Sequence, residues 1–405
     1  MERLVALLGL GVFVGFAYLT SVNRRAIRWR PVMWGLALQF ALGVFILKTT
    51  PGLVIFEWLG SVVSNFLNFS DVGAEFVFGE NFQEAFVAFK VLPTIIFFSA
   101  VISLLYHYGL LQKVVNGVAW VMMRTMKTSG AETLSAAGNI FVGQTEAPLL
   151  IKPYVETMTM SELHAVMTGG FATIAGGVLA AYISFNVPAN HLIAASVMSA
   201  PAALAISKIM FPETEVSTTK GNVSLKVERT TANSIDAIAQ GTIDGLKLAL
   251  NVGAMIIAFL GILAAVNAFL GFLGSLVGYP DFSLELILAT LLAPVAWLMG
   301  IPWDDCRAVG TLLGKKTILN EFIAYLDLQA LIQDNAISDR AITIATYALC
   351  GFANIGSIGI QIGGIGAIAP NLQADLARIG DAGGHKAGEG ASDHGADADA
   401  SEVGL

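Results

Sequence analysis

The stretch AAGNIFVGQTEAPLL (residues 136–150) places three polar residues, Gln144, Thr145 and Glu146, between apolar neighbours. Glycines on both sides allow helical hydrogen bonding to lapse, and we expect the polar residues to form the first turn of a half-helix. Pro148 suits the start of a helix, where its missing N–H is harmless. A helix start offers free N–H groups, and glutamine and threonine supply donors and acceptors for an uncharged polar heterocycle. The alternative is that Gln144 and Glu146 merely cap a helix.

The composition places this stretch in a membrane protein. Of 405 residues, 55% are hydrophobic and 13% are charged, which is about half the charged share of an average soluble domain. The net charge of −8 argues against a nucleic-acid partner. The two cysteines and five histidines form no disulfide framework and no metal-ligand motif. These properties predict a polytopic membrane protein embedded in a lipid bilayer.

Seven apolar windows are long enough to cross a hydrocarbon layer of roughly 30 Å. They lie near residues 3–21, 33–50, 83–106, 165–185, 190–211, 243–274 and 340–363. Segment 53–69 is amphipathic, and we expect it to lie at the membrane interface. Two further short apolar segments, 110–126 and 283–299, each precede a stretch interrupted by polar residues.

Basic residues gather after the first span, after the third span and in the loop 208–229. The positive-inside rule then places these loops inside and the N-terminus outside. Because the first basic cluster follows the first apolar window, that window is interpreted as a span and not as a signal peptide. We expect a multi-pass protein of the bacterial cytoplasmic (inner) membrane with a periplasmic N-terminus.

The order of segments repeats after residue 80. Each half contains a span, an interfacial segment, a polar-interrupted hairpin and a glycine-rich span, first over 83–185 and then over 243–363. The loop charges make the two hairpins enter from opposite sides. We therefore predict an all-α fold of inverted repeats with two opposed re-entrant helical hairpins, interfacial helices and glycine-broken transmembrane helices.

The second hairpin contains another amide beside a carboxylate, Asn320 and Glu321, within KKTILNEFIAY (residues 315–325). A buried carboxylate is costly unless it has a partner, and inside a membrane segment it is a functional candidate by default. The alternative is that Lys315 or Lys316 pairs with Glu321.

The last glycine-rich span reads CGFANIGSIGI (residues 350–360). Asn354 and Ser357 are three residues apart and share one helix face, which favours contact with a ligand. The alternative is small-residue helix packing with hydrogen bonds between helices.

The counterpart span reads GGFATIAGG (residues 169–177), with Thr173 between two glycine pairs. Such pairs are sites where a helix breaks and frees its carbonyl groups. The hydroxyl, the Asn139 side chain and the carbonyls of Val142 and Ile174 would make an all-oxygen, weakly charged cage, which suits Na⁺ better than a divalent ion. The alternative is that the hydroxyl bonds to its own preceding turn.

At these residues the chain resembles the concentrative nucleoside transporters over roughly residues 1–380. The motifs that carry the resemblance are GQTEAP (143–148), NEF (320–322), CGFANIGS (350–357) and GGIGAIAP (363–370). The resemblance implies a homotrimer in which each protomer has its own transport domain. It also implies a nucleoside substrate, Na⁺ as coupling ion and no organic cofactor.

The resemblance assigns three groups of site residues. Nucleobase binding falls to Gly143, Gln144, Thr145 and Glu146, with Phe352 beside the ring. Ribose binding falls to Asn320, Glu321, Asn354 and Ser357. The sodium site falls to Asn139, Val142, Thr173 and Ile174, where Thr173 stands at a position that is often serine in relatives.

We divide the chain into five parts. These are N-terminal scaffold spans with an interfacial helix (1–80), a first repeat with hairpin 1 (81–211), a cytoplasmic loop (212–240), a second repeat with hairpin 2 (241–370) and a polar acidic tail (371–405). Residues 381–405 hold six acids and one lysine and no apolar window, which is typical of a disordered tail. The family follows Asp375–Arg378 with a final span, so that span is expected to be missing here.

The leading hypothesis is secondary active uptake, in which Na⁺ binding organises the first hairpin and completes the nucleoside site. The first alternative is proton coupling through Glu146 or Glu321, since a desolvated carboxyl group can titrate at higher pH. The second is a transport-impaired product without the last span. An intramembrane enzyme using the same two carboxylates is disfavoured, because no nucleophile motif, metal triad or phosphate loop accompanies them.

Overall fold

The computed structural model describes residues 2–220 and 231–381, and within these ranges the chain is helical without strands. The helices of the first range are α1 (Glu2–Leu19), α2 (Trp29–Lys48), α3 (Thr50–Leu67), α4 (Phe69–Phe78), α5 (Leu92–His107), α6 (Leu110–Met126), α7 (Gly130–Gly138), α8 (Ala147–Leu150), α9 (Lys152–Val155), α10 (Met160–Ala172), α11 (Gly176–Ser184) and α12 (Ala189–Met210). The predicted all-α fold is confirmed for the described residues.

The second range contains α13 (Ser234–Leu276), α14 (Leu284–Leu298), α15 (Cys306–Ile318), α16 (Glu321–Gln333), α17 (Asp339–Leu349), α18 (Ile355–Ile368) and α19 (Gln373–Asp381). A π-helical turn, η2 (Val87–Val91), runs into α5, and short 3-10 turns are η1 (Arg24–Ala26), η3 (Trp303–Asp305) and η4 (Pro370–Leu372). The order of the helices in the two ranges follows the repeat that we expected from the sequence.

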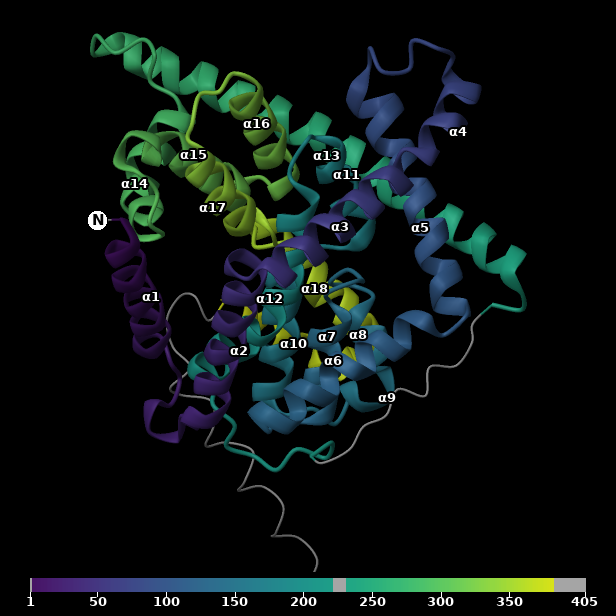
Figure 1. Cartoon of the computed structure of the whole chain (residues 1–405). Helices are drawn as coiled ribbons and strands as arrows, with labels where there is room; N and C mark the ends of the chain where they lie inside the picture. Colours follow the sequence, from purple (N-terminus) through teal and green to yellow (C-terminus); the bar gives the residue numbers. More distant parts are fainter. Residues whose placement is uncertain (1, 221–230, 382–405) are drawn as a thin grey trace, which may run out of the picture.

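The two halves use the same sequence of elements. In the first, α5 and α6 precede the hairpin α7–α8–α9 and the broken pair α10/α11; in the second, α13 and α14 precede the hairpin α15–α16 and the broken pair α17/α18. In Figure 1 the first hairpin lies in the lower part of the molecule and the second in the upper part. This placement agrees with opposed hairpins, while their re-entry into a membrane stays a prediction.

Within residues 2–220 and 231–381, seven helical segments are long and apolar enough to cross a membrane, judged by length and composition. They are Glu2–Leu19, Trp29–Lys48, Thr50–Phe78, Val87–His107, Met160–Ser184, Ala189–Met210 and Ser234–Leu276. Segment 53–69 lies within one of these, Thr50–Phe78, and its interfacial placement stays a prediction. The expected single span 340–363 is instead two helices, because residues 350–354 leave the helical conformation between α17 and α18.

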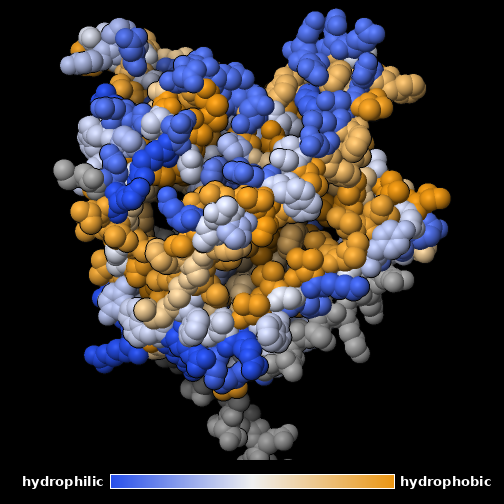
Figure 2. Space-filling view, in the orientation of Figure 1, coloured by the Kyte–Doolittle hydropathy of each residue, from blue (hydrophilic) through white to orange (hydrophobic). Residues whose placement is uncertain are grey.

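Burial is concentrated in the broken helices. The most apolar window of Met160–Ser184 is 61% buried, whereas that of Ser234–Leu276 is 6% buried. All nine residues of α7 are buried. Figure 2 shows apolar residues in a broad band across the middle of the visible face, with polar residues above and below. This pattern indicates apolar outer helices that face lipid around a polar-interrupted centre.

Side-chain caps fix where the central helices begin. Ser129 with Glu132 at α7, and Thr159 with Glu162 at α10, form capping boxes in which the glutamate accepts the N–H of the cap residue. Ser338 caps α17 by accepting the N–H of Ala341. These bonds satisfy N–H groups that would otherwise lack a partner at the start of each helix.

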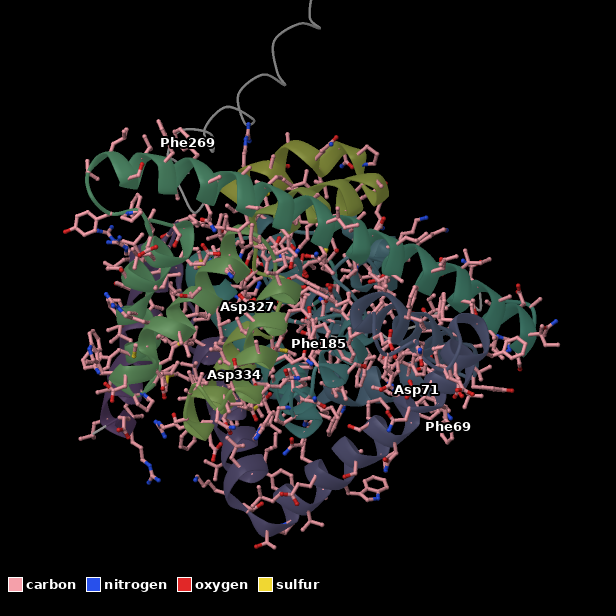
Figure 3. All side chains as sticks on the ribbon, turned by 90° about the horizontal axis from the view of Figure 1, so that it is seen from above. Phe69, Asp71, Phe185, Phe269, Asp327 and Asp334 are labelled. Atoms are coloured by element: carbon pink, nitrogen blue, oxygen red, sulfur yellow. The ribbon has the colours of Figure 1, made fainter. Side chains whose placement is uncertain are left out.

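The long helix α13 extends further than the window 243–274 that was expected to span. It begins at Ser234, because the Asn233 side chain caps it by accepting the Asp236 N–H at 2.9 Å. At 1.5 Å per residue its length is about 65 Å, roughly twice the hydrocarbon thickness. Seen from above, α13 runs along one side of the molecule with Phe269 near its outer end, whereas Phe185 lies near the middle (Figure 3).

Lys208 belongs to the buried interior and not to an exposed basic loop. Its ammonium group lies 2.6 Å from the Glu132 carboxylate and donates to Ser161 Oγ at 2.7 Å, and the side chain is 5% exposed. Removing one partner of such a pair would leave an uncompensated buried charge. Lys208 therefore ties the end of α12 to the first hairpin, and counting it among the basic loop residues was wrong.

The predicted tail starts as a helix. Residues 373–381 form α19, and Leu376 and Ile379 are buried in a cluster with α7 and α10 residues. Their i, i+3 spacing puts both on one face of the helix. The remainder of the predicted tail, 382–405, lies outside the described residues, as does segment 221–230 of the predicted cytoplasmic loop.

The packing of α13 against α5 predicts the effect of a substitution at Gly245. A Cβ atom there would lie 2.8 Å from Ser99 Cβ and 2.9 Å from Ile96 Cα. Gly245→Val should therefore destabilise the protein by about 1–3 kcal/mol, the usual cost of overpacking, and lower its unfolding midpoint in detergent. Gly261→Val on the same helix is the control, because nothing lies within 4 Å of its Cβ position. Equal midpoints for the two variants would contradict the close α5–α13 contact.

Candidate functional site

Four breaks in the central helices meet at one place. They comprise residues 139–146 in the first hairpin, 173–175 between α10 and α11, 319–320 in the second hairpin and 350–354 between α17 and α18. Gly176 N–H donates to Phe141 O, and Phe352 N–H donates to Thr173 O, both at 3.2 Å. Backbone groups freed by one break thus find partners in another, which is required of non-helical backbone inside a membrane protein.

Gly351 shows why the last break needs a glycine. Its φ of +146° lies outside the range that residues with side chains favour. A Cβ atom at this position would also lie 2.6 Å from Phe171 O. The close approach of residues 351–352 to residues 171–173 puts Phe352 N–H within reach of Thr173 O.

Glu321 is held by side chains from two other elements. It is 5% exposed, and its Oε1 accepts a hydrogen bond from Tyr182 OH of α11 at 2.9 Å. Its Oε2 accepts from Asn354 Nδ2 at 3.2 Å. Asn354 also caps α18, because its Oδ1 accepts the Ser357 N–H at 2.8 Å. One asparagine therefore joins the carboxylate of the second hairpin to the start of α18.

Neither neighbouring lysine forms a direct ion pair with Glu321 in the described structure. Lys315 forms an ion pair with Asp327 at 2.7 Å. Lys316 is buried and donates to Ala348 O at 2.9 Å. The carboxylate of Glu321 accepts its side-chain hydrogen bonds from the uncharged Tyr182 and Asn354. Asn320 beside it caps α16 by accepting the Ile323 N–H.

Gln144 joins the first hairpin to α18. Its Nε2 donates to Ser357 Oγ at 3.2 Å, and its Oε1 accepts from Gln361 Nε2 at 3.0 Å. Gln144 is 7% exposed and Ser357 is 2% exposed. The structure thus brings a predicted nucleobase residue into direct contact with a predicted ribose residue.

The other predicted nucleobase residues are more peripheral. Thr145 and Glu146 are exposed; Thr145 approaches α18 at Gly364, and the Glu146 carboxylate folds back over Gly143. Phe352 is half-buried and packs against the main hydrophobic cluster. The half-helix α8 begins at Ala147, so the three polar residues lie in the turn before it and not in its first turn. No side-chain hydrogen bond of Glu146 caps α8, which contradicts the interpretation of Glu146 as a cap.

Asn139 has the environment of a ligand residue. It is 1% exposed, and among residues 2–220 and 231–381 neither Oδ1 nor Nδ2 has a hydrogen-bond partner. Its amide lies against α10, where a Cβ atom on Gly169 would be 3.3 Å from Nδ2. An orphaned buried amide is unfavourable, and an oxygen-liganded cation such as Na⁺ would satisfy its oxygen. Asn139 therefore fits the predicted sodium set.

Thr173 and Ile174 are two further residues of the predicted sodium site. The Thr173 hydroxyl donates to Gly169 O at 2.9 Å, which is the bond to the preceding turn that we considered as the alternative. Since its proton points to Gly169, the lone pairs of its oxygen stay available to a cation. The Ile174 carbonyl precedes the ladder of α11, whose first N–H groups bond to Ala175 O. With Val142 in the adjoining hairpin break, the donor set is uncharged oxygen, which suits Na⁺.

Two contact residues were missed from the sequence. Gln361 lies four residues after Ser357, so helical spacing from a residue already singled out was a usable signal. Tyr182 lies 139 positions from Glu321, and its own sequence context, an apolar span, carries no sign of a polar role.

An all-α polytopic membrane protein with polar groups gathered at breaks in its central helices has the architecture of a transporter. Three family models match the chain in order. They are described as Na⁺ dependent nucleoside transporter N-terminus (residues 8–81), nucleoside recognition (88–188) and Na⁺ dependent nucleoside transporter C-terminus (191–382).

Relatives and a solved structure agree with these matches. The chain is 48% identical over 393 residues to solute carrier family 28 member 3 of Eptatretus stoutii, covering 94% of this chain and 58% of the relative. It is also 48% identical to sodium/nucleoside cotransporter 1 of Mus musculus, covering 93% and 60% respectively. The structure of CNTnw in an inward-facing substrate-bound state matches with a TM-score of 0.88 and 39% identity, covering 94% of this chain and 93% of that one.

The chain therefore belongs to the concentrative, Na⁺-dependent nucleoside transporters, a family of transporters and not of enzymes. The resemblance found in the sequence motifs is confirmed. The chain spans about three fifths of the length of the two curated relatives, 58% and 60%.

The contact between Tyr182 and Glu321 predicts a loss of stability in Tyr182→Phe. Removing the hydroxyl leaves one buried carboxylate oxygen without its donor, which costs about 1–3 kcal/mol. The unfolding midpoint in detergent should fall. Tyr154→Phe is the control, because the Tyr154 hydroxyl makes no hydrogen bond within the described parts of the chain. A Tyr182→Phe midpoint equal to that of the control would argue against the bond.

Proposed function

We propose that the protein takes up nucleosides across a membrane by sodium-coupled alternating access. The observation that carries this proposal is the meeting of Gln144 and Glu321, one from each hairpin, with the single segment that holds Asn354 and Ser357. A ligand at this place would contact both halves of the molecule. Movement of the hairpins around it would then expose it to either side.

The substrate contacts follow from the chemistry of each group. We assign the nucleobase to Gly143, Gln144, Thr145 and Glu146 with Phe352 beside the ring, and the ribose to Glu321, Asn354 and Ser357. A carboxylate that accepts from neutral donors can accept equally from ribose hydroxyls. A nucleoside between Gln144 and Ser357 would exchange their mutual bond for bonds to the base and the sugar. Asn320 supports this site by capping the helix that starts with Glu321.

We assign the sodium ion to Asn139, Val142, Thr173 and Ile174. Bound there, the ion would supply positive charge to an orphaned amide oxygen and to carbonyl groups freed by two helix breaks. The two helix breaks that hold these residues are joined by the backbone bond from Gly176 N–H to Phe141 O. Thr173 O also accepts the N–H of Phe352, which we assign to the nucleobase. Sodium contacts at Thr173 and base contacts at Phe352 therefore act on the same hydrogen-bonded backbone. Coupling of this kind is reciprocal between the two ligands.

The assembly and orientation in our proposal come from the family resemblance and the loop charges. The protomers form a homotrimer, the N-terminus lies outside, and the membrane is a bacterial cytoplasmic membrane. The five-part division into scaffold, first repeat, loop, second repeat and tail belongs to the same proposal.

Uptake by proteoliposomes tests the proposed function. We expect labelled uridine to accumulate when an inward sodium gradient is imposed, and to equilibrate slowly without it. Liposomes without protein give the background. Uptake that needs no sodium but follows a pH gradient would replace sodium by protons as the coupling ion. No uptake by correctly folded protein under either gradient would contradict the proposal.

A substitution at Asn139 tests the sodium assignment. Asn139→Ala removes a predicted ligand and should raise the sodium concentration for half-maximal uptake by about tenfold, as expected for a lost contact to a charged group. Ser135→Ala is the control, since Ser135 lies one turn earlier on α7, is equally buried and has no hydroxyl partner in the described structure. If both variants keep the sodium requirement of the parent protein, the assignment is wrong.

A further inference from the structure

Gln361 lies at the junction of three central elements. It is 1% exposed and projects from α18 towards the first hairpin and α10. Its Nε2 donates to Gln144 Oε1 at 3.0 Å and to Met167 O at 3.0 Å. Both N–H groups of this amide are therefore used, each by a different element.

The backbone carbonyl of Met167 determines which end of the Gln361 amide faces α10. A carbonyl oxygen accepts and cannot donate, so Gln361 must turn its Nε2 towards it. The second N–H of the same nitrogen then meets Gln144, which must present its own Oε1. Gln144 is left with its Nε2 pointing away, towards Ser357 Oγ at 3.2 Å. The orientation of two side-chain amides thus follows from one main-chain acceptor.

Packing holds the two amides in place. They lie on α10 at Gly170, where a Cβ atom would come 2.7 Å from Gln361 Nε2 and 2.9 Å from Gln144 Cβ. The Oε1 of Gln361 is buried and has no hydrogen-bond partner in the described ranges. No hydrogen bond to Oε1 therefore favours another orientation of this amide. The two hydrogen bonds that Nε2 donates determine its orientation.

We propose that Gln361 is a positioning residue that fixes Gln144 as a hydrogen-bond donor towards the nucleobase. This inference rests on the proposed function, because it assumes that Gln144 contacts the base. Gln144 then selects nucleosides whose base offers an acceptor, such as a ring carbonyl oxygen, at that position. Gln361 itself stays behind Gln144 and acts only through it.

A double-mutant cycle on uridine binding in sodium tests the proposal. Gln361→Met keeps the length of the side chain and removes both donors, and it should weaken uridine binding about fivefold to tenfold, the worth of one well-placed hydrogen bond. In the Gln144→Ala background the same substitution should change the affinity less than about twofold, because nothing remains to be oriented. A purely structural role would weaken binding equally in both backgrounds and would overturn the proposal.

Gln112→Met is the matched control. Gln112 also donates its Nε2 to a helix carbonyl, Tyr106 O at 2.8 Å, but it lies on α6 and does not touch Gln144. Its substitution should leave uridine affinity unchanged in both backgrounds. An effect equal to that of Gln361→Met would overturn the proposal.

Gln361→Glu gives a second variant of nearly the same shape, in case Gln361→Met does not fold. At a pH high enough to ionise the new carboxyl group, it cannot donate to Met167 O or to Gln144, so uridine binding should fall at least fivefold. Binding equal to the parent protein would overturn the proposal. Failure of the parent protein to bind uridine would contradict the proposed function itself, whereas binding with additive effects in the cycle would contradict only the role of Gln361.

Discussion

The hydrogen bond from Phe352 N–H to Thr173 O joins the two broken helices on which the rest of the centre depends. A helix that stops inside a membrane protein leaves N–H and carbonyl groups that lipid cannot satisfy. Here the break after α10 meets the break after α17, and Gly176 N–H reaches Phe141 O in the first hairpin. Each break is tolerable because another break lies beside it. Backbone bonds join three of the interruptions, and the second hairpin is joined to them through the Glu321 side chain, which accepts from Asn354 and Tyr182.

The polar side chains of the centre follow from this arrangement. Asn354 stands at the start of α18 because its oxygen caps that helix, and this position lets its nitrogen reach Glu321. Gln144 reaches Ser357 because the first hairpin opens towards the same helix start. Outside, an apolar band covers the surface in addition to the hydrophobic clusters of the interior (Figure 2). At the depth of the apolar band, polar side chains therefore gather in the interior and not on the surface, which marks them as candidates for function in a membrane protein.

Local sequence was enough to predict the breaks in the first hairpin and after α10 and to single out the two carboxylates, because glycines and polar residues within apolar runs mark them directly. The break at 350–354 falls inside an expected single span, and the re-entry of the hairpins stays a prediction. Local sequence was not enough to predict partners. Tyr182 and Glu321 are brought together by the packing of α11 against the second hairpin, and no local pattern encodes that contact. Lys316 shows the converse. Its closeness to Glu321 in sequence suggested an ion pair, but its ammonium group donates to Ala348 O instead. The extent of α13 and the helical start of the tail also depended on caps and packing and not on hydropathy.

Equilibrium binding measures the link between the sodium set and the nucleoside set most directly. The affinity for uridine should be measured in sodium and in choline, and the affinity for sodium with and without saturating uridine. If the joined breaks couple the two sites, sodium should tighten uridine binding, and uridine should tighten sodium binding by the same factor. Uridine binding of equal affinity in sodium and in choline would contradict the coupling of the two sites through the joined helix breaks.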